Sequence, residues 1–138
     1  MNTDTSYIVA TAVPHHLRLR FLPHHFGRSM MRVESEIFTQ MGDLCADYAG
    51  AFWEFYNLSN GGCYMAPQSA ERVAISVDGN GYQGTVSADA AGIIATLFAL
   101  SHLSMRYPTD WRMSERFHQL REYAQQHGEA AHIFAAID

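Results

Sequence analysis

The sequence of 138 residues predicts one α+β domain, in which an antiparallel sheet of about four strands is covered by helices in a second layer. Three observations predict this fold class. Apolar residues recur with a helical period towards both ends of the chain and alternate with a period of two in the middle. Turns rich in glycine and asparagine divide the middle region into a meander of hairpins. The length fits a single domain, residues 1–138, and 48% hydrophobic residues are enough to build its core.

The chain begins with an expected strand. Residues 7–13 are apolar and β-branched, and Pro14 ends this run. Residues 15–22 fit a strand, because apolar side chains alternate with arginines. They also fit a helix, because Pro14 suits a first helical position and apolar residues stand four apart. We favour a short helix that ends at Pro23.

The next segment predicts an amphipathic helix that ends before Gly50. Its apolar residues share one helical face, and acidic and amide side chains lie opposite. The apolar face carries Val33, Ile37, Phe38, Met41, Leu44, Cys45 and Tyr48.

The period then changes to two, which indicates strands. Asn60-Gly61 tolerates positive φ at both central positions, as a tight hairpin turn requires, and residues 78–81 form a second turn. The four expected strands span residues 52–58, 63–66, 72–77 and 82–86.

Three helices are expected after the strands. Ser87 is a good N-cap for a helix over residues 88–105, which is apolar nearly all round and should be the central buried helix. Pro108 separates it from a third helix that ends at Gly128, and residues 130–137 form a short last helix. The third helix carries Met113, Phe117, Leu120 and Ala124 on one face.

Charge is distributed unevenly along the chain. All nine cations are arginine, and residues 5–33 hold four arginines, four histidines and no acid, whereas five arginines and thirteen acids follow. This basic front is a candidate contact region. A net charge of −5 without lysine argues against strong non-specific DNA binding, and the modest acid content argues against imitation of DNA. The four arginines of the basic front are Arg18, Arg20, Arg28 and Arg32.

The sequence predicts a soluble cytoplasmic protein without membrane contact. Residues 1–6 carry an acid and no cation, which does not fit a signal peptide. Two cysteines without Cys-x-x-Cys spacing suit a reducing compartment. The longest apolar run, residues 90–100, falls short of the ~20 residues that a membrane-spanning helix needs.

We expect no metal, cofactor, small-molecule substrate or catalytic residue. The eight histidines have spacings that do not place two imidazoles on one helical face. Cys45 lies on an apolar helix face and is expected in the core. Cys63 follows a turn, and turns can leave a thiol exposed, so a small enzyme that pairs Cys63 with His102 or His118 stays open as an alternative.

The aromatic hairpin offers a second candidate contact region. Large rings stand on both faces of its strands, so one face should line the core while the other is covered by a helix or exposed as a binding patch. The ring contacts we select are Trp53, Tyr56 and Tyr64.

Three blocks of sequence and the C-terminus resemble a known family. The middle block comprises Tyr48-Ala-Gly50, Phe52-Trp-Glu-Phe-Tyr-Asn-Leu-Ser-Asn-Gly-Gly62 and Tyr64-Met-Ala-Pro67. The late block comprises Ser87-Ala-Asp-Ala-Ala-Gly92 and Leu97-Phe-Ala-Leu100. The early block comprises Val13-Pro14, Arg18, Phe21-Leu-Pro23 and His25-Phe-Gly27, and the chain closes with Ile133-Phe-Ala-Ala-Ile-Asp138. Over nearly its whole length, the sequence closely resembles the ArdB/KlcA antirestriction family.

The resemblance implies a function. Members of this family are encoded on plasmids, other mobile elements and genomic islands, and they protect incoming DNA from type I restriction-modification systems of the host. They differ from the strongly acidic ArdA proteins, which mimic DNA. No catalytic residue or cofactor comes with the resemblance, so we expect an inhibitor and not an enzyme. Its partner would be the type I complex or a host factor that the complex needs, with weak DNA contact at most.

Two alternatives are retained. The first is a nucleic-acid-binding plasmid regulator that uses the basic front. The second is the small Cys/His enzyme. The matched blocks are rich in aromatics, glycines and turn formers, so they also suit a folding signature.

Overall fold

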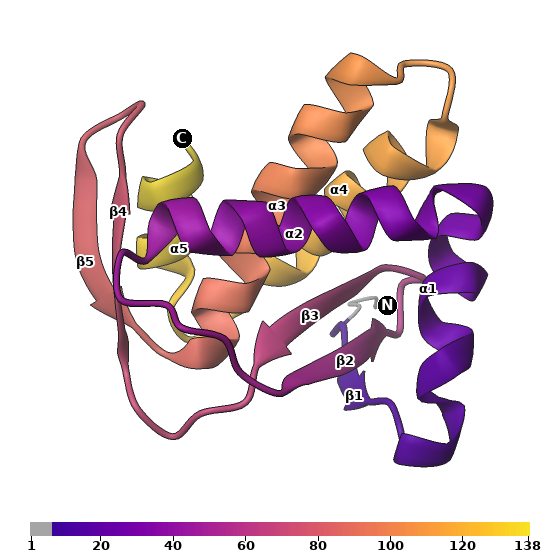
Figure 1. Ribbon diagram of the computed structural model, residues 1–138, viewed down its shortest axis with the longest axis horizontal. Helices are drawn as coiled ribbons and strands as arrows, with labels where there is room; N and C mark the ends of the chain where they lie inside the picture. The colour runs from indigo at the N-terminus through magenta and orange to yellow at the C-terminus, as the bar shows by residue number, and fades with distance from the viewer. Residues whose placement is uncertain (1–6) are drawn as a thin grey trace, which may run out of the picture.

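The computed structural model describes residues 7–138 and confirms the α+β class (Figure 1). Strands occupy the middle of the chain and most of the helices precede or follow them, as the change of period predicts. In chain order the elements are β1 (Ala10–Ala12), the 3₁₀ helix η1 (His15–Leu17), α1 (Arg18–Phe26), the 3₁₀ helix η2 (Gly27–Ser29), α2 (Met30–Leu44), β2 (Trp53–Leu58), β3 (Cys63–Pro67), β4 (Val73–Val77), β5 (Tyr82–Val86), α3 (Ala88–Arg106), α4 (Trp111–Ala124) and α5 (Ala130–Ile137).

The strands form two antiparallel sheets, where one sheet of about four strands was expected. One sheet has the order β1-β2-β3, and β4 pairs with β5 alone. The N-terminal segment therefore supplies the third strand of the first sheet, with Ala10 opposite Leu58. β3 ends at Pro67, the Gln68 N–H still donates to the Phe52 carbonyl oxygen at 2.7 Å, and the chain then leaves for the second sheet. The meander thus breaks between its two hairpins.

α3 is the central buried helix and contacts strands of both sheets (Figure 1). Ser87 caps it as predicted, because its Oγ accepts a hydrogen bond from the Ala90 N–H at 3.1 Å. Length and composition would allow α3 to cross a membrane, but 67% of that window is buried inside the protein itself, as in a core helix. Gly92 lies so close to β3 that an added Cβ would stand 2.4 Å from the Cα of Ala66. The late block therefore packs directly on the middle block.

Residues 15–26 are helical, which settles the ambiguous segment. The prediction that Pro23 ends this helix is wrong, because α1 continues through the proline to Phe26. Buried Phe21 and Phe26 hold the helix against the core on both sides of Pro23, which offsets the hydrogen bond that proline cannot donate. Gly27, with a φ of 52°, ends α1.

The remaining elements follow their predicted patterns with small differences. α2 buries Val33, Ile37 and Met41 completely or nearly so, but Tyr48 lies beyond its end. The β2–β3 loop has positive φ at Gly61 alone. Asn60 shapes that loop through its side chain instead, since its Oδ1 accepts a hydrogen bond from the Gly62 N–H at 3.0 Å.

Candidate interaction surface

The basic front does not form one surface. Arg18 is turned inward, where its guanidinium donates to the Trp53 carbonyl oxygen at 2.7 Å and to Glu54 Oε1 at 3.3 Å. The same group lies over the Phe55 ring, 4.2 Å from its centre. Arg18 therefore joins α1 to β2 and is not available as a free contact.

The other three arginines of the front are exposed but separate into two places. Arg20 lies on α1 and borders a small depression with His24. Arg28 lies in η2 and Arg32 in the first turn of α2, where the Arg32 guanidinium lies 3.8 Å from the centre of the Tyr107 ring. Tyr107 follows α3, so Arg32 meets a part of the chain that the charge pattern did not indicate.

The expectation that Trp53 and Tyr64 lie at the surface is wrong. Trp53 is 5% exposed, and its indole N–H donates to the Tyr48 hydroxyl at 2.7 Å. Tyr64 is 2% exposed, and its hydroxyl donates to Asp89 Oδ1 at 2.7 Å. Tyr56 is half-buried and stacks on Tyr64, with 4.7 Å between ring centres. The hairpin rings belong to the core because α2 covers Trp53 from one side and the α3–α4 layer covers Tyr64 from the other.

Cys63 is buried as well, so the exposed thiol on which the enzyme alternative depends is not observed. It is 1% exposed, and burial raises the pKa of its thiol to about 12, with a smaller opposing effect from Arg116. Within residues 7–138 neither His102 nor His118 forms a hydrogen bond with it, and His102 lies instead 3.0 Å from Gln40 Nε2. A neutral thiol without a base is a poor nucleophile at physiological pH. Cys45 is buried, as predicted.

A polar network beside the hairpin was not predicted from the sequence. Asp89 Oδ2 lies 2.8 Å from His127 Nε2, while its other oxygen accepts from Tyr64. His127 Nδ1 in turn accepts from the Glu129 N–H at 2.9 Å. Burial would raise the pKa of Glu129, but hydrogen bonds from Ser87 and the nearby Arg72 lower it overall. Each polar group of this network forms a hydrogen bond with another member, and the network links α3 to the loop before α5.

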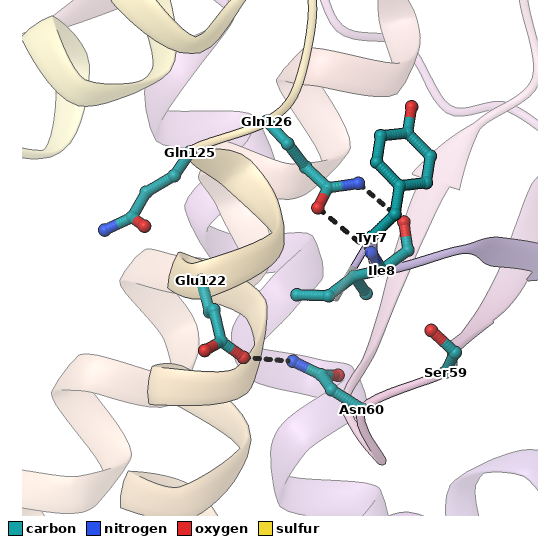
Figure 2. Close-up of a pocket in the computed structure, with 7 residues that line it drawn as sticks. All are labelled: Tyr7, Ile8, Ser59, Asn60, Glu122, Gln125 and Gln126. Carbon is teal, nitrogen blue, oxygen red and sulfur yellow. Dashed lines mark hydrogen bonds between the residues drawn. The ribbon is translucent and has the colours of Figure 1, made fainter. Parts of the chain in front are cut away.

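A polar depression of about 490 Å³ lies where the N-terminal strand meets the end of α4 (Figure 2). The Gln126 side chain accepts from the Ile8 N–H at 3.0 Å and donates to the Ile8 carbonyl oxygen at 2.6 Å, so it joins the N-terminal segment to the residues that follow α4. Glu122 accepts a hydrogen bond from Asn60 at 3.0 Å. The depression therefore contains a structural joint, and its lining residues are Tyr7, Ile8, Ser59, Asn60, Glu122, Gln125 and Gln126.

Comparisons with known proteins agree on one family. The family of antirestriction proteins matches residues 46–138. Two Escherichia coli proteins named antirestriction protein KlcA are 52% and 49% identical, over 96% and 100% of this chain and 95% and 100% of their own. A third protein of that species, the putative antirestriction protein YubI, is 33% identical over 88% of this chain and 89% of its own.

A solved structure shares the fold. It is 48% identical, covers 100% of both chains and has a TM-score of 0.91. It comes from work on the KlcA and ArdB proteins, which describes a novel fold and antirestriction activity against type I DNA restriction systems in vivo but not in vitro. From sequence and fold together, the chain belongs to the ArdB/KlcA family of antirestriction proteins.

Proposed function

We propose that this protein protects incoming mobile-element DNA in the cytoplasm by inhibiting cleavage by host type I restriction-modification enzymes. It acts by binding a macromolecule, without chemistry of its own and without imitating DNA. The observation that carries the proposal is the likeness over the full chain to a structure, with a TM-score of 0.91, from work that describes this activity in vivo.

Binding is favoured over catalysis by the state of the reactive groups. Burial raises the pKa of the Cys63 thiol to about 12, and Asp89 and His127 bond to each other. A nucleophile needs an adjacent base and access to substrate. The described residues supply neither at Cys63.

Imitation of DNA is disfavoured by charge. Duplex DNA carries one negative charge per roughly 1.7 Å of its axis. Here fourteen acids are offset by nine arginines, and Glu54 and Glu129 form ion pairs with arginines. This surface is too weakly negative to replace a DNA duplex.

The contrast described for KlcA and ArdB, activity in vivo but not in vitro, bears on the partner. It favours a target that is present or active only in the cell. We therefore place the partner in the type I restriction complex as it works in the cell, or in a host factor that the complex requires.

The test is transfer of unmodified DNA into cells with an active type I system, with and without the protein. Transfer should rise in the presence of the protein and should not change in a host that lacks restriction. Equal transfer into restricting cells with and without the protein would refute the proposed function.

A second arm separates inhibition from modification of DNA. DNA is passed through a host that lacks restriction and modification but makes the protein, and is then moved into restricting cells without it. We expect this DNA to be cut as usual. If it arrives protected, the protein has altered the DNA chemically and is an enzyme.

The regulator hypothesis keeps one supporting observation, the exposed Arg20, Arg28 and Arg32 side chains. If it is correct, DNA retention should fall steeply with salt, since each neutralised phosphate releases counterions. Weak retention with a shallow salt dependence favours the inhibitor.

A further inference from the structure

The nine arginines divide into paired and unpaired groups. Within residues 7–138, Arg18, Arg72, Arg116 and Arg121 each form an ion pair with a carboxylate. The other five, in the same part of the chain, form none. Four of these five belong to two segments, residues 27–32 and 105–112, that contact each other, and Arg20 lies on α1. The four are Arg28, Arg32, Arg106 and Arg112.

These four arginines form what we name the arginine corner, made by segments 27–32 and 105–112. Figure 1 shows the start of α2 below the connection between α3 and α4. Ser29 Oγ donates to Asp110 Oδ2 at 2.6 Å, which ties the two segments together. Gly27 has no side chain, and an added Cβ would stand 2.3 Å from the Arg112 guanidinium. The contact between Arg32 and Tyr107 gives a third link across the corner.

The two segments also carry three exposed apolar side chains. Met31 is 67% exposed, Met105 is 70% exposed and Trp111 is 58% exposed. Each is the chain neighbour of a corner arginine. Arginine, tryptophan and methionine are enriched in protein interfaces, and tryptophan and arginine supply a large share of binding hot spots.

The charge of the corner is opposite to that of the chain. Its two segments hold four arginines and one acid, while the whole chain has a net charge of −5. The one acid, Asp110, caps α4 by accepting from the Arg112 N–H and also accepts from Ser29. Arg28, Arg32 and Arg106 are exposed and Arg112 is half-buried against Gly27, and none of the four forms an ion pair within residues 7–138, so the exposed guanidinium groups are available to carboxylates of another molecule.

We propose that the arginine corner is the docking surface for an acidic protein partner. The proposal rests on the proposed function, which it deepens by naming the surface and the chemistry of the partner. A protein surface fits better than nucleic acid, since a phosphate backbone gives no apolar contact to Met31 and Met105.

Charge reversal tests the corner against a matched site. Arg32→Glu and Arg20→Glu both change an exposed, unpaired arginine at the third residue of a helix. An acid is tolerated in the first turn of a helix, so neither variant should lose its fold. We expect Arg32→Glu and Arg28→Glu each to reduce protection in restricting cells roughly tenfold, and Arg20→Glu to leave it unchanged.

Equal protection by all three variants, with unchanged thermal unfolding midpoints, would overturn the proposal. The unmutated protein separates this result from failure of the proposed function. If it gives no protection, the function is wrong, and the following experiment still decides whether the corner binds a partner.

Photo-crosslinking in cells identifies the chemistry of the partner. A photoreactive residue replaces Met31, Met105 or, as a control, Leu19, which is 94% exposed and is the second residue of α1 as Met31 is of α2. We expect nuclease-resistant adducts from the two corner positions, attached to a peptide rich in Asp and Glu and lost in Arg32→Glu. The Leu19 control should give none. A nuclease-sensitive adduct, an adduct to a peptide without excess acid, or no adduct from the corner would refute it.

Discussion

The β2–β3 hairpin with α3 and the arginine corner are built in opposite ways. In the first region the sequence blocks that resemble the family meet one another inside the protein. Tyr64 of the middle block bonds to Asp89 of the late block, and His25 of the early block lies 2.7 Å from Asn57 of the middle block. The corner leaves its arginines without ion pairs in the described chain and its apolar side chains exposed.

The contrast places the family signature and the proposed contact surface in different parts of this protein. The signature residues form joints between elements, which explains why rings such as Trp53 and Tyr64 are buried. The proposed surface uses residues outside those blocks, apart from Gly27 at its edge. Changes to the joints should therefore reduce stability, and changes to the corner should reduce protection. Four predictions test the joint side of this division.

The largest effect is expected at the contact between Gly92 and β3. Gly92→Ala places a Cβ 2.4 Å from Ala66 Cα and from the Met65 carbonyl oxygen, and backbone cannot move aside by a rotamer change. We expect a loss of about 3 kcal/mol or more in the free energy of unfolding, measured by chemical denaturation.

Gly42→Ala is the control for that substitution. Gly42 lies in α2 with no atom within 4 Å of an added Cβ, so the alanine should raise stability by about 0.5–1 kcal/mol. A small effect of Gly92→Ala would show that α3 and β3 are less tightly packed than described.

The next effect is the pH dependence that His25 produces. Its Nε2–H donates to Asn57 Oδ1, and burial lowers its pKa from 6.5 to about 4 despite that hydrogen bond. Between these values the unfolded chain binds more protons than the folded one. Stability is therefore full above pH 6.5 and falls by about 3 kcal/mol as the pH drops through 4.

Unfolding free energies at several pH values measure this effect. His25→Gln stays neutral over the same range, so its stability should fall less between pH 6.5 and 4. Parallel curves for the two proteins would show that His25 is not a joint of this kind.

A smaller loss of stability is expected when Arg18 is replaced. Arg18 was predicted as a surface contact, but in the structure it joins α1 to β2. Arg18→Ala removes a charged hydrogen bond to the Trp53 carbonyl and the pair with Glu54, and should cost about 2 kcal/mol of stability. Thermal and chemical unfolding measure the loss. An unchanged midpoint together with lost protection would return Arg18 to the contact surface.

The smallest effect concerns Cys63. Cys63→Ala should lower stability by about 1 kcal/mol, because it removes a buried sulfur, and should leave protection in restricting cells unchanged. In the unmutated protein the thiol should react with a thiol reagent only after unfolding. Loss of protection in a folded Cys63→Ala protein would restore the enzyme hypothesis.

Much of the fold could be predicted from local patterns. The cap at Ser87, the buried helix after it and the two hairpins depend on residues close in sequence, and each is observed. The division into two sheets depends on which elements pack on α3, and local periodicity does not contain that information. The same holds for Pro23, where tertiary burial of Phe26 overrides the helix-ending tendency of proline.

The candidate surface was only half predictable. The run without acids drew attention to Arg28 and Arg32, but it also included Arg18, whose partner Glu54 lies far along the chain. Arg106 and Arg112 belong to the acidic part of the sequence, so charge counts concealed them. Rings on both faces of a strand do not reveal which face a helix will cover. Helices cover both faces of this hairpin, so Trp53 and Tyr64 are both buried.

The hydrogen bond between Ser29 and Asp110 joins residues that are 81 positions apart in the sequence, so the corner forms only when both segments have folded together. The family match at residues 46–138 includes Arg106 and Arg112 but not Arg28 and Arg32. A chain that lacks either segment would carry only two of the four arginines. The proposed docking surface would be complete only late in synthesis, after residues 105–112 have been made and have packed against residues 27–32.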